Sequence, residues 1–225
     1  MNRKLQRSLL STNGSTRWLH RSCRSLKTRA LVIGFLCVGL TTPAAAKVCE
    51  FGSVATGISP PPSVREDALE DNKKIHVFPE KSGLTLSSTG VVVNANTYGS
   101  HNNKTLGTFA VGQAMKVDSD YIHYDPNAVV KRLSGSVVFC EPILGVIASD
   151  SDLRGSHSLL GAPGTIYPVV NDNEGIEGGN AEHRDYFNIY KVGGEMRGLS
   201  FSFKASADID TLRVITKAKP PAPVV

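Results

Sequence analysis

Long apolar runs are missing from this 225-residue sequence. The longest, Ala30–Leu40, has 11 residues, whereas a helix that crosses a bilayer needs about 20. Tryptophan occurs once, at Trp18, and aromatic residues make up 7% of the chain. The four cysteines form no Cys-x-x-Cys pair, which argues against the zinc sites built on that spacing. These absences exclude a protein with several membrane spans and a cysteine-rich zinc protein.

The first 46 residues predict a secretory signal peptide. Eight basic and no acidic residues precede Ala30, the apolar run follows, and Pro43 with Ala44–Ala46 supplies a small-residue cleavage site. We therefore expect cleavage near Ala46 and a secreted product, periplasmic or extracellular, without a transmembrane segment. The alternative is an anchor that is never cleaved.

The net charge changes sign when this segment is removed. The whole chain has 25 basic and 20 acidic residues, a net charge of +5. Without the eight basic residues of the signal peptide, 17 basic residues face 20 acidic ones, a net charge of −3. No basic stripe then remains, so nucleic acid is not an expected partner.

Two cysteines, Cys49 and Cys140, remain after cleavage. An even pair of cysteines in an exported protein favours a disulfide. We therefore predict a Cys49–Cys140 bond between residues 91 positions apart. The alternative is two separate buried thiols.

Short β-type segments dominate the remaining sequence. Segments such as "DYIHYD" and "GLSFSFKAS" alternate apolar and polar residues, as strands with one buried face do. Glycine-containing turns separate them, and no amphipathic stretch is long enough for a helix bundle. This pattern predicts an all-β fold, a single antiparallel β-sandwich domain of jelly-roll-like type.

We expect four parts along the chain: a signal peptide (1–46), an N-terminal segment (47–82), the β-sandwich domain (83–216) and a proline-rich tail (217–225). Within the second part, residues 59–74 resemble a charged linker that begins with prolines. One short helix over Val64–Asp71 is the regular element that we expect there.

Signatures of catalysis are weak. The stretch "GSHSL", Gly155–Leu159, lacks the Gly-x-Ser-x-Gly spacing of a serine-hydrolase nucleophile. Ser156, His157 and Asp152 are close in sequence, but catalytic triads are assembled from separate elements. A polysaccharide hydrolase with two catalytic carboxylates is an open alternative, because the distance between such carboxylates in the fold cannot be read from the sequence. We therefore expect a protein that is not an enzyme.

Four aspartates are candidate ligands of a structural Ca²⁺ ion: Asp150 and Asp152 in "DSDLRG", and Asp118 and Asp120 in "VDSDYIHYDPN". Carboxylates at alternate positions can point oxygens at one ion, and Ca²⁺ takes six to eight oxygen ligands. The EF-hand pattern fails, because Arg154 stands where an oxygen ligand should be. The alternative is solvated acidic loops, and we expect no other cofactor.

Zinc is not predicted. The histidines that follow the signal peptide show no two residues with ligand-like spacing: His76, His101, His123, His157 and His183.

The segment "NANTYGSHNN" is the best candidate for ligand binding. Tyr98 can stack on a sugar ring, and four neighbours can bond to sugar hydroxyls: Asn94, Asn96, His101 and Asn102. The alternative is an ordinary turn.

Four stretches together resemble a known family: "VDSDYIHYDPNA", "GSVVFCEPILGVIASDSDL", "LLGAPGTIYP" and "LSFSFKASADIDTLRVIT". They are similar to secreted bacterial β-sandwich proteins of uncharacterised function, related to domains of exported proteins with a PEP-type C-terminal sorting tail. The resemblance spans roughly Gly83 to Thr216. It implies a β-sandwich and an exported location, and it implies no activity or catalytic residues. The end of this sequence, "KAKPPAPVV", lacks the Pro-Glu-Pro motif, membrane span and basic residues of the sorting tail.

The segment Pro142–Pro168 contains two aspartates, an arginine and a histidine between apolar ends. We interpret it as a loop that crosses between two strands, with Asp150 and Asp152 capping the loop's own amides. The whole sequence then predicts a secreted, non-catalytic β-sandwich that binds a glycan, a matrix component or a surface protein. The alternatives are a structural envelope protein and a secreted polysaccharide hydrolase.

Overall fold

Strands dominate the part of the chain that the computed structural model describes: residues 48–96, 102, 106–127, 132–170, 172–176, 185–204 and 208–219. All of these residues belong to one compact unit, Thr41–Val225. The strands in the described residues are β1 (Val48–Phe51), β2 (Ala55–Gly57), β3 (Ile75–Thr85), β4 (Val91–Val93), β5 (Ala95–Asn96), β6 (Phe109–Val111), β7 (Lys116–Tyr124), β8 (Leu133–Phe139), β9 (Ile143–Ile147), β10 (Tyr186–Val192), β11 (Glu195–Phe203) and β12 (Asp210–Lys217). The helix is α1 (Asp150–Leu160).

Two larger sheets contain most of these strands. One has four strands in the order β1-β8-β11-β10, and all its pairs are antiparallel. The other has six strands in the order β2-β3-β7-β12-β9-β5, and only the β2–β3 pair is parallel. Strands β4 and β6 form a separate antiparallel pair.

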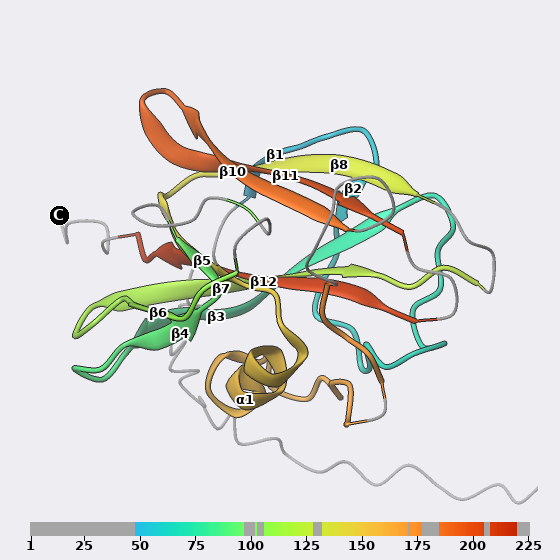
Figure 1. Cartoon of the computed structure of the whole chain (residues 1–225), viewed down its shortest axis with the longest axis horizontal. Helices are drawn as coiled ribbons and strands as arrows, with labels where there is room; N and C mark the ends of the chain where they lie inside the picture. Colours follow the sequence, from blue (N-terminus) through green and yellow to red (C-terminus); the bar gives the residue numbers. More distant parts are fainter. Residues whose placement is uncertain are drawn as a thin grey trace, which may run out of the picture. The chain divides into compact units, whose positions relative to one another are not determined.

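The two larger sheets pack face to face around an apolar core. Figure 1 shows the four-stranded sheet above and the six-stranded sheet in the middle. Phe139, Leu199 and Phe201 from the first sheet meet Ile122 and Val214 from the second. Full burial of one such side chain contributes about 1.5–3 kcal/mol. The prediction of an all-β, sandwich-like single domain is confirmed.

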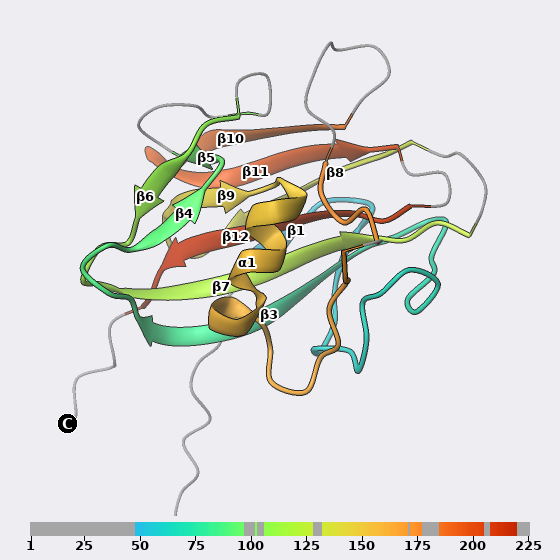
Figure 2. The ribbon, with the colours of Figure 1, turned by 60° about the horizontal axis from the view of Figure 1, so that its bottom comes forward.

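A third layer covers the other face of the six-stranded sheet. Helix α1 lies across that face, with β4 and β6 beside it (Figures 1 and 2). Leu153 and Leu160 of α1 form a second apolar cluster with Phe78, Val117 and Ile215 of the sheet. The six-stranded sheet is therefore buried on both faces.

Double burial explains the two central strands. Every residue of β7 after Lys116 and every residue of β12 before Lys217 is buried. Polar residues of β7, among them Asp118, Ser119 and Asp120, therefore lie inside the protein. The alternation in this sequence does not mark a solvent face, because both faces are covered.

The expectation that Pro142–Pro168 is a loop is wrong, because α1 occupies Asp150–Leu160. Ser149 caps the helix: its hydroxyl accepts from the Asp152 backbone N–H and donates to the Asp152 carboxylate. Leu153, Ser156 and Leu160 recur at the spacing of one helical face, and all are buried. The polar residues between them and Gly155 obscure this apolar stripe in the sequence. Among the described residues, no helix has the length and apolar character needed to cross a membrane.

The N-terminal segment also differs from the expectation. Residues 64–71 form turns and bends rather than the expected short helix. Strand β3 runs through residue 83, the expected start of the sandwich, and pairs along its length with β7. Strands β1 and β2 likewise pair within the two sheets, so the sandwich includes residues that precede position 83.

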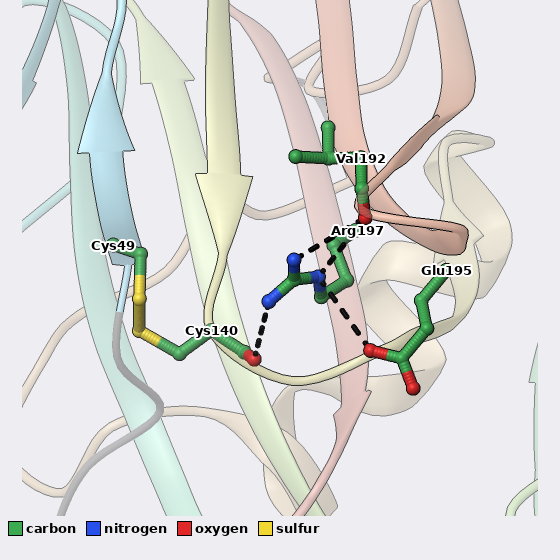
Figure 3. Close-up of a disulfide and its surroundings, with 5 residues drawn as sticks. All are labelled: Cys49, Cys140, Val192, Glu195 and Arg197. Atoms are coloured by element: carbon green, nitrogen blue, oxygen red, sulfur yellow. Dashed lines mark hydrogen bonds and ion pairs between the residues drawn. A yellow bond between two sulfur atoms is a disulfide. The ribbon is translucent and has the colours of Figure 1, made fainter.

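The predicted disulfide is confirmed. Cys49 of β1 and Cys140, which follows β8, are bonded, with Cα atoms 5.1 Å apart (Figure 3). Arg197 of β11 donates to the Cys140 carbonyl at 3.4 Å and to the Val192 carbonyl at 3.2 Å. The bond thus fixes the edge strand β1 to the strand beside it.

Replacing both cysteines, Cys49→Ser with Cys140→Ser, should lower the free energy of unfolding by about 4 kcal/mol, because the open chain gains loop entropy when unfolded. Urea denaturation of the double variant and of the oxidised protein measures the loss. A reductant should destabilise the parent protein equally and leave the double variant unchanged. Equal free energies of unfolding for the double variant and the oxidised parent protein would contradict this expectation.

Candidate functional site

A fully buried ion pair lies between α1 and the six-stranded sheet. Arg213 comes from β12 and Glu80 from β3, and both side chains are 0% exposed. The guanidinium donates from Nε to Glu80 Oε2 at 2.6 Å and from Nη2 to Glu80 Oε1 at 2.7 Å. A bidentate pair of this kind fixes the orientation of both planar groups.

All five N–H groups of Arg213 have an acceptor. Nη1 donates to the Leu153 carbonyl at 3.2 Å and to Ser156 Oγ at 2.5 Å, and Nη2 lies 3.1 Å from His157 Nδ1. With the two bonds to Glu80, these contacts use every donor that an arginine has. Because three of the acceptors lie on α1, Arg213 holds the helix on the sheet.

His157 joins this ion pair to a second buried carboxylate, Glu174. Arg213 can only donate, so His157 Nδ1 accepts and Nε2 carries the proton. Nε2 lies 3.2 Å from Glu174 Oε1, and the Tyr121 hydroxyl donates to Glu174 Oε2 at 3.1 Å. The geometry therefore selects the Nε2–H tautomer of His157.

Two tyrosines enclose the guanidinium. Tyr167 donates to Glu80 Oε1 at 2.6 Å, and its ring stacks on His157 with centroids 4.4 Å apart. The Arg213 guanidinium carbon lies 5.1 Å from the centre of the Tyr121 ring and 5.5 Å from that of Tyr167. Such contacts stabilise a cation more strongly where water is excluded.

Burial and charge set the ionisation of these groups. Burial alone lowers the pKa of Arg213, but the charge and hydrogen bonds of Glu80 outweigh it, and the net shift is upward. Burial, followed by Glu174, raises the pKa of Tyr121. Burial, followed by Glu80, raises the pKa of Tyr167. The guanidinium therefore stays charged, and both hydroxyls keep the protons that they donate.

A groove lies between α1 and β4. It encloses about 280 Å³ and is lined by Gly90, Val91, Val92, Ser151, Asp152, Gly155, Ser156 and Leu159. A Cβ atom at Gly155 would meet no other atom within 4 Å, so the helix leaves open space there. Val92 and Leu159 are each 42% exposed. The lining thus combines exposed apolar side chains with a carboxylate and two hydroxyls.

The buried network holds two of the polar groove residues in place. Ser156 Oγ accepts from Arg213 and donates to the Leu153 carbonyl at 2.8 Å. Asp152 Oδ2 accepts from Asn94 Nδ2 at 2.6 Å and from Ser149 Oγ at 2.7 Å. Both contacts of Asp152 use the same oxygen. The polar side of the groove is therefore rigid before any ligand binds.

Asn94, a predicted ligand-binding residue, has an internal role. It is 4% exposed, and its Oδ1 accepts from the backbone N–H groups of Ala148 at 2.7 Å and Ser149 at 2.9 Å. Its Nδ2 donates to Asp152, as described above. Asn94 thus connects the end of β4 to the start of α1 and holds Asp152, which lines the groove.

Of the other predicted ligand-binding residues, the structure describes Asn96 and Asn102. Asn96 is buried in β5, and Asn102 forms a single antiparallel bridge with Asn188 of β10. Tyr98 and His101 lie outside the described residues. Sugar binding by this segment therefore stays a prediction.

Asp150 and Asp152, predicted Ca²⁺ ligands, lie in the first turn of α1, where negative charge stabilises a helix. Asp150 Oδ1 accepts from the Gly175 N–H at 2.6 Å and lies 3.8 Å from Arg154 Nη1. Both carboxylates therefore hold the start of a helix, rather than capping a loop as expected.

Asp118 and Asp120, the other two predicted ligands, lie on β7. Asp118 Oδ1 accepts from the Gly83 N–H at 2.7 Å. Asp120 is 1% exposed, and its Oδ2 has no hydrogen-bond partner among the described residues. Across the ranges that the structure describes, no three His, Cys, Asp or Glu side chains gather as a metal site. The Ca²⁺ site stays a prediction.

The structure places the residues of the two catalytic alternatives as follows. Ser156 bonds to Arg213 and Leu153, while His157 contacts Arg213 and Glu174, so neither contact joins this serine to this histidine. Glu80 and Glu174 are each 0% exposed and are held by neighbouring side chains. A sugar could not reach these two carboxylates without displacing α1.

The residues at the centre of the network were not predicted from the sequence. Glu80, Tyr121, Tyr167, Glu174 and Arg213 come from segments far apart in the chain. One signal was present: Arg213 stands in the middle of the apolar strand "TLRVIT", where a charge is tolerated only with a buried partner. The partner itself is 133 positions away and could not be identified from sequence.

Comparison of the chain with protein-family models, curated proteins and solved structures gives no match.

Arg213→Met should destabilise the protein by about 3–5 kcal/mol, because it leaves Glu80 buried and unpaired. Urea denaturation measures the change. The matched control is Arg65→Met, which removes a pair with Asp172 in which the arginine side chain is 46% exposed, and it should cost at most about 1 kcal/mol. Adding Glu80→Met to Arg213→Met should restore much of the loss. Equal effects at Arg65 and Arg213 would show that burial of the pair is unimportant.

Asp120→Asn should stabilise the protein at pH 7. Burial, then Glu80 and Asp118, raises the pKa of Asp120 well above 3.8. Because the pKa of Asp120 is higher in the folded than in the unfolded protein, the parent protein is most stable below pH 3.8. Its free energy of unfolding then falls as the pH rises, by up to about 1.4 kcal/mol per pH unit.

Urea denaturation from pH 3.5 to pH 8 tests this expectation. The advantage of Asp120→Asn should shrink toward low pH, and the exposed control Glu50→Gln should change stability by less than about 0.5 kcal/mol throughout. If Asp120 binds Ca²⁺ instead, the substitution destabilises the protein at pH 7 when Ca²⁺ is added.

Proposed function

We propose that this protein is an exported, non-catalytic binding module, and that the groove between α1 and β4 binds a single sugar unit of a glycan. The predicted signal peptide supports export, and a disulfide suits an oxidising compartment. The observation that carries the proposal is the groove itself, in which fixed polar groups lie opposite exposed apolar side chains.

The size of the groove limits its ligand. Sites for drug-sized ligands usually enclose about 300–1,000 Å³. A volume of about 280 Å³ suits one small ring rather than an extended chain. We therefore assign the groove to a terminal or protruding sugar and not to the length of a polysaccharide.

The chemistry of the lining matches the two faces of a sugar ring. Asp152, Ser151 and Ser156 carry oxygen atoms that can bond to hydroxyl groups. Val92 and Leu159 present apolar surface to the C–H face of the ring. Because Asp152 and Ser156 are already held by the protein, binding costs little side-chain entropy.

A structural role in the cell envelope is the second candidate. Among the described residues, five large apolar side chains besides Val92 and Leu159 are exposed: Phe51, Ile166, Val169, Val170 and Tyr186. Exposed apolar residues mark protein contacts when they are contiguous. Ile166, Val169 and Val170 lie within one short segment, and this favours a protein contact more than a sugar contact there.

Gly155→Trp is the sharpest test, because the new side chain would enter the groove without a clash at Cβ. We expect it to weaken binding of a sugar ligand at least tenfold, about 1.4 kcal/mol or more. The ligand is first found by screening the purified chain on an array of bacterial and plant glycans. Titration calorimetry then compares the variants.

Gly155→Ala is the matched control. It should preserve affinity and stabilise the helix by about 1 kcal/mol, since alanine favours helices more than glycine does. Unchanged affinity in Gly155→Trp would place any sugar site elsewhere. No binding to any glycan would favour the structural role, and release of sugar fragments would favour the hydrolase.

A further inference from the structure

His76 and His123 are direct neighbours in the six-stranded sheet. They are paired residues of the antiparallel strands β3 and β7. Paired residues project from the same face of a sheet, with Cβ atoms about 5 Å apart. The two imidazoles therefore lie together, although 47 positions separate them in the chain.

Three of their four ring nitrogens are buried without a hydrogen-bond partner among the described residues. These are both nitrogens of His123 and Nδ1 of His76. The side-chain oxygen of Asn72, four positions before His76, is also buried without a hydrogen-bond partner among the described residues. A buried polar atom left unpaired costs about 1–3 kcal/mol. Because a neutral imidazole carries a proton on one nitrogen, His76 Nδ1, one nitrogen of His123 and the Asn72 oxygen offer lone pairs, and these point to a bound species that accepts electron pairs.

The fourth ring nitrogen has a different environment. His76 Nε2 lies 3.7 Å from Asp71 Oδ2. Asp71 is itself fixed, because its Oδ1 accepts from the N–H groups of Lys73 at 2.7 Å and Lys74 at 3.1 Å. Histidines that bind metals usually turn one nitrogen to the ion and the other to a carboxylate. His76 approaches this arrangement, with Nε2 directed to a carboxylate just beyond hydrogen-bond distance and Nδ1 as the free nitrogen.

We propose that His76 and His123 form a binding site for a divalent transition-metal ion, Zn²⁺. Imidazole nitrogen is a preferred ligand of this ion, and the Asn72 carbonyl oxygen or water would complete its coordination. Only two imidazoles contribute, so binding is weaker than at structural sites with four cysteine or histidine ligands.

Both imidazoles are neutral in the folded protein, as metal binding requires. Burial lowers the pKa of His76, although Asp71 partly opposes the shift. Burial, followed by the charge of His76, lowers the pKa of His123 to about 3. A metal ion therefore has no proton to displace at neutral pH.

Zinc titration of the untagged full chain at pH 7, in competition with a chromogenic chelator, tests the site. We expect one Zn²⁺ per chain. His76→Gln should lower the affinity at least tenfold, and His123→Gln should do the same. His157→Gln is the matched control and should leave the affinity unchanged, because His157 contacts Arg213 and Glu174 instead.

Copper provides a second measurement that does not depend on affinity. The electron paramagnetic resonance spectrum of the Cu²⁺-loaded chain should show coupling to two imidazole nitrogens, and either glutamine variant should reduce this to one. Urea denaturation shows whether each variant folds. If His123→Gln does not fold, His76→Gln decides, since its side chain is 13% exposed.

Absence of bound Zn²⁺, or equal affinity in His76→Gln and the parent chain, overturns the proposal. This outcome is independent of the sugar-binding groove. The groove is lined by α1 and β4, and neither histidine contributes to it.

Discussion

The ion pair between Arg213 and Glu80 is the contact on which the helix side of this protein depends. Removing two charges from water costs several kcal/mol for each ion, and their attraction compensates only when the remaining hydrogen-bonding groups are also satisfied. Here that condition is met, because all five donors of Arg213 have acceptors. The acceptors lie on β3 and α1, so the donors are satisfied together only when the helix occupies one position on the sheet. An apolar pair of equal volume would pack with the helix in several positions on the sheet, because apolar contacts have no fixed direction.

The need for such a contact follows from the burial of the six-stranded sheet on both faces. Toward the four-stranded sheet, the residues at the centre of the core, such as Ile122, Leu212 and Val214, are apolar and pack without specific bonds. Toward α1 the same strands carry Arg213, Tyr121 and Thr211, which require partners. The helix and the segment after it supply them: Tyr121 bonds to Glu174, and Thr211 donates to the Glu174 carbonyl. The hydrogen-bonded network around Arg213 therefore lies on the helix side of the six-stranded sheet.

The sequence predicts the buried side of a strand correctly where one face of the sheet is exposed to solvent. Strands β10 and β11 lie in the sheet with one exposed face, and their alternation at Phe187, Ile189 and Leu199 predicts the buried side correctly. The disulfide followed from the number of cysteines. The prediction of one buried and one exposed face is wrong for β7. Its residues alternate between apolar and polar, but both of its faces are buried.

Helix α1 was missed for a related reason. Its buried face includes Ser156, whose hydroxyl is satisfied by Arg213 at a distance of 57 positions. A polar residue at a core position breaks the apolar period that identifies a helix. The groove was equally inaccessible to sequence reasoning, since it exists only where β4 meets α1.

The network and the groove are two sides of one helix. Ser156 bonds to Arg213 on the inner side and lines the groove on the outer side. Gly155, beside it, weakens the helix yet leaves the groove open. A sequence selected for stability alone would favour alanine at position 155 and bury Leu159. The groove to which we assign sugar binding therefore lies on a helix whose position is fixed by the buried network, and the same network holds the polar side chains of its lining rigid.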